Sequence, residues 1–96
     1  MATGKSGEAR LVLRLYVAGR APNSVRAIAS VEAICALHFS AAHELEIVDM
    51  LEQPERALAD GIIATPTLLK LRPQPVRRMI GDLSDTSLLL RTLGGP

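Results

Sequence analysis

An apolar segment, an amphipathic segment and a second apolar segment follow one another early in this chain, and their order constrains the fold most. Residues Leu11–Val17 are apolar except for Arg14, which is typical of a strand covered on both faces. From Ser24 to about His38 the apolar residues recur at helical spacing, which predicts an amphipathic helix with Asn23 or Ser24 as its N-cap. Ala42–Met50 is the second predicted strand. This order predicts a βαβ unit with a right-handed crossover and parallel strands.

The remainder of the chain predicts a short helix, two strands and a last helix. Pro54–Asp60 has proline in its first turn and a glycine after its end, as short helices do. Ile62–Leu71 and Val76–Ile80 are rich in strand-forming residues and are separated by a proline-rich turn, which predicts a hairpin. Ser84 is the expected N-cap of the last helix.

Together these elements predict an α/β fold with the order βαβαββα. A Thr65-Pro66 dipeptide enters the third strand, and this order with such a proline resembles the thioredoxin fold, in which the preceding peptide bond is usually cis. Two short apolar runs, Leu68–Leu71 and Leu88–Leu90, fit a strand or a buried helix equally well.

Length and composition limit the size of the core and the class of partner. The chain has 96 residues, only 2% of them aromatic, and a formal net charge of +1. We expect one domain over residues 11–96, behind a disordered tail at residues 1–10. So few aromatic residues and so little net charge disfavour nucleic acid as a partner. No apolar stretch is long enough to span a membrane, and a single cysteine makes the cytoplasm the expected location.

Side chains that could carry chemistry are few. Thioredoxin-like redox proteins need two thiols where the first strand turns into the first helix, and the residues there, Arg20–Ser24, include none. Cys35 lies on the apolar face of the first helix, so we expect it to be buried. This face comprises Val25, Ile28, Val31, Ile34 and Cys35. The two histidines do not complete a tetrahedral metal site. We therefore expect a protein that is not an enzyme and has no cofactor or metal.

Two blocks of sequence strongly resemble the KaiB family of circadian clock proteins. The first consists of Leu15–Gly19 followed by Pro22–Ala27. The second consists of Ala64–Leu68, Pro75–Arg78 and Ile80–Ser84. The similarity runs without gaps from near the first strand to the start of the last helix, and motifs this long and ordered are specific.

The resemblance implies a regulator that binds a KaiC-type ATPase and autokinase and modulates its phosphorylation cycle. In the cyanobacterial clock, KaiA is a further partner. Members of the family also adopt a second arrangement, βαββααβ, which is a tetramer that does not bind KaiC, whereas the thioredoxin-like monomer does. The resemblance thus implies slow fold switching and a homo-oligomer, a dimer or a tetramer.

Residues carried over by position form two sets. The prolines expected to differ between the two arrangements are Pro66, Pro73 and Pro75, and isomerisation before proline is slow enough to gate such a change. The residues expected to contact a partner are Arg26, Gly61, Arg77 and Arg78. The chain departs from the family at Gln74, which replaces a proline, and at Gly61, where a lysine is common.

Alternative functions remain open from the sequence. One is a one-thiol redox activity through Cys35, and another is an adaptor role in stress within a reduced KaiB–KaiC system. The sensor domain of a clock histidine kinase shares the thioredoxin-like fold, but no kinase domain follows in this sequence. The basic cluster of Arg72, Arg77 and Arg78 fits a solvated strand face as well as a partner contact.

Overall fold

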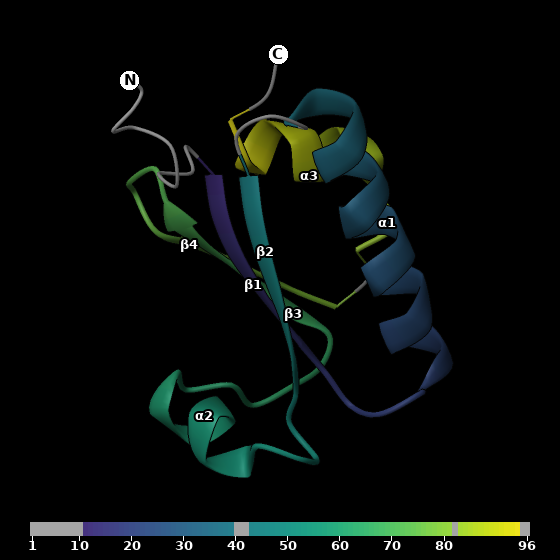
Figure 1. The fold of residues 1–96 in the computed structure, drawn as a ribbon, viewed down its shortest axis with the longest axis vertical. Helices are drawn as coiled ribbons and strands as arrows, with labels where there is room; N and C mark the ends of the chain where they lie inside the picture. The colour runs from purple at the N-terminus through teal and green to yellow at the C-terminus, as the bar shows by residue number, and fades with distance from the viewer. Residues whose placement is uncertain (1–10, 40–42, 82, 95–96) are drawn as a thin grey trace.

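Four strands form one sheet that carries helices on both faces. The structure is a computed structural model and describes residues 11–39, 43–81 and 83–94, so the expected tail at residues 1–10 lies outside the described residues. The elements are β1 (Leu11–Val17), α1 (Pro22–His38), β2 (His43–Asp49), α2 (Pro54–Ala59), β3 (Thr67–Arg72), β4 (Arg77–Ile80) and α3 (Thr86–Thr92) (Figure 1). The predicted thioredoxin-like order βαβαββα is confirmed.

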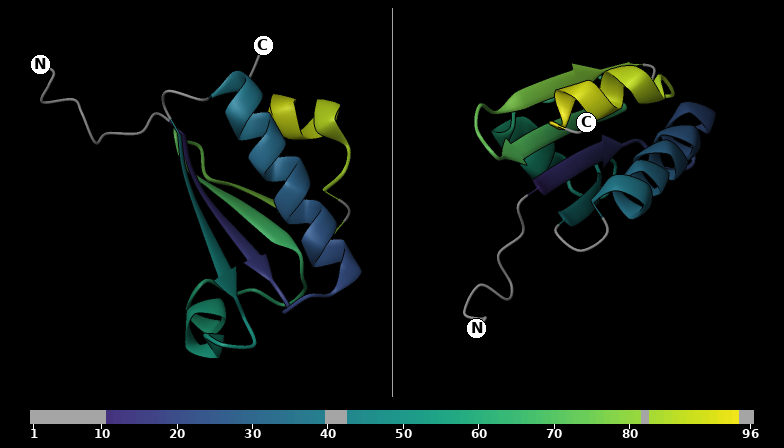
Figure 2. Two further views of the ribbon diagram at one scale, coloured as in Figure 1. Left: turned by 45° about the vertical axis from the view of Figure 1, so that its right-hand side comes forward. Right: turned by 90° about the horizontal axis from the view of Figure 1, so that it is seen from above.

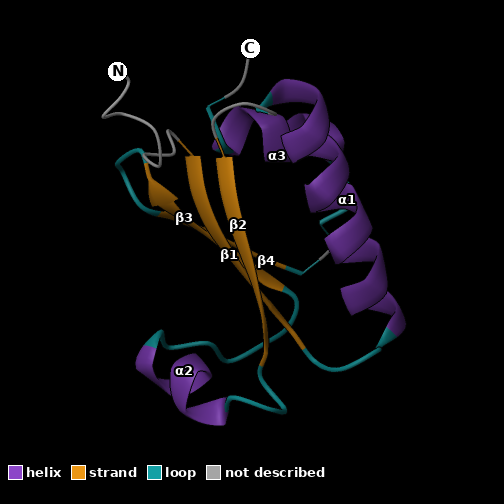
Figure 3. Cartoon of the chain, in the orientation of Figure 1, coloured by secondary structure: helices purple, strands orange, loops and turns teal. Residues whose placement is uncertain are grey.

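The strand order in the sheet is β2-β1-β3-β4. β1 is parallel to β2, as a βαβ unit requires, and antiparallel to β3, while β3 and β4 form the predicted antiparallel hairpin. Helices α1 and α3 lie on one face of the sheet and α2 lies near the other (Figures 2 and 3). β2 and β4 are therefore the two edge strands.

The core has two parts because β1 is covered on both faces. On the side of α1 and α3, Leu13 and Leu15 of β1 pack with Val31 of α1 and Leu89 of α3. On the side of α2, Tyr16 belongs to a smaller buried cluster, whose other members are Val48, Ala57, Ile62 and Leu69. The nearly continuous apolar sequence of β1 is explained by these two layers.

The start of α1 differs from the prediction. The helix begins at Pro22 with Ala21 as its N-cap, and no side chain caps it. Ser24 is buried, and its hydroxyl instead accepts a hydrogen bond from the amide of Ala18 at 3.1 Å. Val25, predicted on the apolar face, is exposed. The earlier start follows from Pro22, whose fixed φ suits the first helical position.

Three further boundaries are corrected. The predicted strand Ile62–Leu71 is a strand only from Thr67, because a turn precedes it in which the Thr67 hydroxyl donates to the carbonyl of Ala64 at 2.6 Å. The N-cap of α3 is Asp85, not Ser84, and its carboxylate accepts from the amide of Leu88 at 3.0 Å. β2 ends at Asp49, one residue earlier than predicted, and the predicted start at Ala42 lies outside the described residues. The first two corrections concern polar or proline residues that local structure uses differently from the predicted pattern.

Candidate partner-binding surface

The residues predicted to contact a partner fall in three places rather than one. Gly61 and Arg78 meet beside the end of α2, where Arg78 donates to the carbonyl of Gly61. Arg26 lines a hollow that also includes Pro66. Arg77 lines a groove between β4 and α3. Arg77 and Arg78 lie on opposite faces because alternate residues of a strand point to opposite sides of the sheet, and Arg26 lies on α1, on the same face as the Arg77 groove.

Arg78 ties β4 to the C-terminal end of α2. Its guanidinium donates one hydrogen bond to the carbonyl of Gly61 at 3.0 Å and one to the carbonyl of Asp60 at 2.9 Å. A cation is favourable at this end of a helix, where carbonyl groups lack helical partners. Gly61 has φ +69°, a left-handed conformation that glycine adopts freely. The glycine therefore lets the chain turn so that its carbonyl faces Arg78.

A network of charged and polar side chains lies beneath this junction. The Tyr16 hydroxyl donates to Oδ2 of Asp60 at 2.6 Å, and Arg14 forms an ion pair with the same oxygen at 2.9 Å. Arg14 also pairs with Glu46 at 3.0 Å, and Arg56 pairs with Glu46 at 2.5 Å. The network joins β1, β2 and α2, and so fixes the position of the helix whose end Arg78 contacts.

The network shifts the pKa values of its members. The hydrogen bond from Arg56, helped by Arg14, lowers the pKa of Glu46 to about 2. The hydrogen bond from the Tyr16 hydroxyl and the charge of Arg14 lower the pKa of Asp60. Burial raises the pKa of Tyr16. Both carboxylates are thus ionised at neutral pH. The network was not predicted from the sequence, although Arg14, the one charged residue in a strand expected to be buried, indicated that a partner must exist.

Exposed apolar side chains lie close to this junction in the chain. Leu58, three residues before Gly61, is 82% exposed, and Ile63, two residues after it, is 89% exposed. Leu51, in the turn before α2, is also exposed. Large apolar side chains around a polar anchor are common features of protein–protein contact surfaces. The turn at Gly61 thus places an arginine anchor and exposed apolar side chains in one region.

The hollow at Arg26 has a volume of about 310 Å³ and lies between the start of α1 and the segment before β3. Arg26 is exposed and forms a short hydrogen bond with the side chain of Asn23. Pro66 is buried at the wall of this hollow, and its carbonyl accepts from the amide of Gly81 at 3.1 Å. Arg26 and Pro66 are far apart in the sequence, but both line this hollow. The structure thus brings Arg26 close to one of the predicted switch prolines.

The three predicted switch prolines all follow cis peptide bonds, at Thr65-Pro66, Arg72-Pro73 and Gln74-Pro75. The first of these agrees with the resemblance to the thioredoxin fold. Pro73 and Pro75 are exposed in the connection between β3 and β4.

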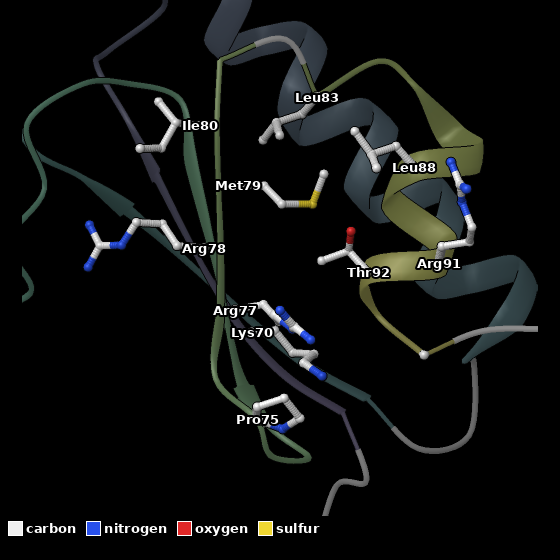
Figure 4. Close-up of a pocket in the computed structure, with 11 residues that line it drawn as sticks. Lys70, Pro75, Arg77, Arg78, Met79, Ile80, Leu83, Leu88, Arg91 and Thr92 are labelled. Atoms are coloured by element: carbon white, nitrogen blue, oxygen red, sulfur yellow. The ribbon is translucent and has the colours of Figure 1, made fainter.

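The groove at Arg77 opens on the side of β4 opposite to the guanidinium of Arg78, although Arg78 is also among the residues that line it. Figure 4 shows Arg77 on the side of Lys70 and α3, and Arg78 pointing away. The groove has a volume of about 700 Å³, and its lining includes two cations that the sequence analysis did not select, Lys70 and Arg91. The register of the β3–β4 pair and the position of α3 bring them there, and neither is visible in a local sequence pattern.

Groups that could support other chemistry are placed as follows. Cys35 is 1% exposed, and burial raises the pKa of its thiol. Nδ1 of His43 lies 2.7 Å from the carbonyl oxygen of Phe39. Over residues 11–39, 43–81 and 83–94, the structure holds no cluster of metal-ligating side chains. No helix in the same residues has the length and apolar character required to cross a membrane.

Comparison with known proteins shows which protein family and which known fold this chain matches. The family model for the KaiB domain matches residues 14–94. The chain is 49% identical over 79 residues to the circadian clock oscillator protein KaiB of Synechococcus elongatus, an alignment that covers 82% of this chain and 78% of that protein. The same identity and coverage of this chain hold for KaiB of Prochlorococcus marinus subsp. pastoris, with 74% of that protein covered.

Two solved structures illustrate the fold. The N-terminal domain of Synechococcus elongatus SasA superposes with a TM-score of 0.71 at 25% identity, covering 86% of this chain and 82% of that domain. Chloroplastic thioredoxin z superposes with a TM-score of 0.78 at 14% identity, covering 97% of this chain and 83% of that protein. The second likeness shows a shared fold alone.

Proposed function

Because the chain belongs to the KaiB family of circadian clock proteins, we propose that it is a non-enzymatic regulator that binds a KaiC-type ATPase and modulates its phosphorylation cycle. The observation that carries the proposal is the 49% identity to KaiB clock oscillator proteins over 82% of this chain. KaiA is a second partner in this proposal where the host contains it. An adaptor role in stress is the alternative in a reduced system.

The junction of Gly61 and Arg78 is the surface proposed for the ATPase. Arg78 is held by two backbone carbonyls, so little side-chain entropy is lost when its remaining donors meet a partner. The apolar side chains of Leu58 and Ile63 are exposed in the same segment. Arginine is one of the residue types enriched among binding hot spots, and the exposed apolar side chains nearby in the chain could contribute apolar contact area.

The redox alternative is disfavoured by the position of Cys35. A reactive cysteine needs access to solvent and a lowered pKa, so that the thiolate forms at neutral pH. Cys35 has the opposite environment, since it is buried between α1 and the sheet and its pKa is raised.

The proposal includes slow switching between this fold and the family's βαββααβ arrangement. The N-terminal β1-α1-β2 unit is common to both arrangements, so the change is confined to the second half. The apolar runs in β3 and α3 fit a strand or a helix locally, and two arrangements that differ by a few kcal/mol need such segments. In this proposal the thioredoxin-like monomer binds the ATPase, and the other arrangement is the oligomer.

Binding to the KaiC-type ATPase of the same organism tests the function. We expect a complex, visible by native mass spectrometry after hours of incubation with ATP. If a scarce binding-competent state limits the reaction, the rate of complex formation becomes independent of ATPase concentration. Arg78→Ala is expected to weaken binding at least about fivefold, which corresponds to a loss of about 1 kcal/mol of binding free energy.

Arg20→Ala is the matched control, because Arg20 is also an exposed arginine and lies outside the junction. Urea unfolding of both variants separates lost binding from lost stability. The absence of any complex with the wild-type chain after prolonged incubation would overturn the proposed function. A rate that rises linearly with ATPase concentration over the whole range would overturn the slow-switching part alone.

A further inference from the structure

The groove between β4 and α3 combines cations from three elements with apolar side chains. Lys70 lies on β3, Arg77 on β4 and Arg91 on α3, and all three line the groove. Met79 and Leu88 line it as well (Figure 4). We propose that this groove binds a short acidic peptide segment of a protein partner, with apolar side chains between its carboxylates. The proposal rests on the proposed function only in taking a protein as the partner. It concerns the side of β4 opposite to the Arg78 guanidinium, although Arg78 is also among the lining residues of the groove.

Lys70 and Arg77 form an unfavourable pair in the absence of an anion. They are directly opposite each other in the register of β3 and β4, and like charges in this arrangement destabilise a sheet. Lys70 is only 6% exposed, so its side chain is held beside Arg77 by the residues packed around it. A bound carboxylate would offset the repulsion between the two cations, because it could pair with both.

The chain itself supplies no carboxylate for these cations within the part that the structure describes. The described lining contains no aspartate or glutamate, and none of the ion pairs seen among described residues involves Lys70, Arg77 or Arg91. By contrast, Arg14 and Arg56 have carboxylate partners on the other face of the sheet. Within the described residues, the groove therefore presents positive charge that is complementary to an anionic ligand.

The remainder of the lining favours a peptide over a nucleic acid. No aromatic side chain lines the groove among the described residues, and the one tyrosine, Tyr16, is buried in the cluster on the side of α2. Bases of single-stranded nucleic acid would have no stacking platform. Apolar side chains of a peptide, in contrast, could pack against Met79 and Leu88, which line the groove together with the cations.

The size of the groove fits a segment of a few residues. Its volume of about 700 Å³ lies within the range of about 300–1,000 Å³ typical of sites for drug-sized ligands. A single phosphate would leave most of this volume empty, and would not contact β3, β4 and α3 together. A short peptide would place separate carboxylates near Arg77 and Arg91.

Fluorescence anisotropy with labelled peptides tests the proposal on the full chain. The probe is a short peptide that alternates glutamate and leucine, compared with one that alternates lysine and leucine and one that alternates glutamate and serine. We expect the first to bind, the second not to bind, and the third to bind more weakly. Arg77→Ala and Arg91→Ala are each expected to weaken binding of the first peptide at least about fivefold, whereas Arg20→Ala leaves it unchanged.

Two results would overturn the proposal. One is the absence of binding by the glutamate–leucine peptide at low salt, where charge interactions are strongest. The other is tighter binding of a single-stranded oligonucleotide that is lost in Arg77→Ala, which would assign the groove to nucleic acid.

The ATPase assay separates the two proposals. A chain that binds the ATPase but not the peptide refutes the groove alone, and a chain that binds the peptide but not the ATPase refutes the proposed function alone.

Discussion

Cys35 is the residue whose environment separates a redox protein from a binding protein. Its side chain is buried in the cluster that α1 and α3 form with the sheet, and its thiol pKa is raised by burial and by the charge of Glu32. We expect Cys35 in the native chain to react with a thiol reagent on the order of a hundredfold more slowly than in the urea-unfolded chain, because core residues react only after an opening that costs several kcal/mol. Stopped-flow absorbance with a disulfide reagent measures both rates.

A control cysteine shows whether the slow reaction is due to burial. Ala36, the next residue of α1, is exposed, so Ala36→Cys in a Cys35→Ala background is expected to react at nearly the unfolded rate. Equal and fast rates for Cys35 and the control would contradict the buried position and would restore the one-thiol activity as a candidate.

The candidate site was only partly predictable at the level of single residues. Arg78 and Gly61 were both selected, but their contact depends on the packing of β4 beside α2, which no local pattern records. Lys70 and Arg91 were not selected. Lys70 occurs in an apolar run as a single charge, and only the β3–β4 register shows that it lies opposite Arg77. A site whose residues come from separate helices and strands can be recognised only from the tertiary structure.

At the level of elements, hydrophobic patterns predicted the types and order of all the described helices and strands. α1 was identified by its helical periodicity, and β1 by a short, nearly continuous apolar run that is typical of a strand covered on both faces. The ends of elements were predicted less well, because caps and turns compete for the same polar residues. Asp85 caps α3 although Ser84 was expected, and the turn before Thr67 shortens the predicted third strand.

Gly61 provides a test of one element boundary, the end of α2. Its φ of +69° costs residues other than glycine about 1–2 kcal/mol. A Cβ at this position would meet Nη2 of Arg78 at 3.9 Å, an ordinary contact, so the cost comes from backbone conformation and not from a clash. We expect Gly61→Ala to lower the free energy of unfolding by about 1 kcal/mol, measured by urea unfolding followed by circular dichroism.

Gly61→Asn is the matched variant, because asparagine tolerates the left-handed conformation better than alanine. We expect it to be less destabilising than Gly61→Ala. An alanine variant as stable as the wild-type chain would mean that this turn is absent from the most stable arrangement in solution. Such a result would point to the family's βαββααβ arrangement as the ground state.

For the whole molecule, the small aliphatic core is compatible with two arrangements. Only 2% of the residues are aromatic, and the larger core cluster consists mostly of leucine, valine and isoleucine. Aliphatic cores tolerate repacking when their volume is kept. The polar network of Arg14, Glu46, Arg56 and Asp60 is different, because its ion pairs depend on the position of α2 against the sheet. It favours the arrangement described here over any in which α2 moves.

This network makes the stability of the fold depend on pH in a defined window. The pKa of Glu46 is lowered from 4.5 to about 2, chiefly by Arg56, and that of Asp60 is lowered from 3.8, chiefly by the Tyr16 hydroxyl. A carboxylate with a lower pKa in the folded state binds fewer protons there, so folding is favoured above the unfolded pKa and loses this contribution as the pH falls. We expect the urea midpoint to be constant near neutral pH and to fall from about pH 5 toward pH 2. The contribution of Glu46 to this decrease in the free energy of unfolding is on the order of 1 kcal/mol or less, because the Glu46 side chain is 46% exposed.

Two glutamine variants on the same strand isolate this effect. Glu46→Gln is expected to lower the midpoint at neutral pH and to reduce its decline in acid. Glu44→Gln is the control, because Glu44 also lies on β2 and is exposed, but takes part in none of the ion pairs of the described residues. Urea titrations at several pH values between 7 and 2.5 compare the two. If both variants kept the acid decline of the wild-type chain, the Arg56–Glu46–Arg14 network would not hold α2 against the sheet in solution, and the arrangement described here would lose its main polar support.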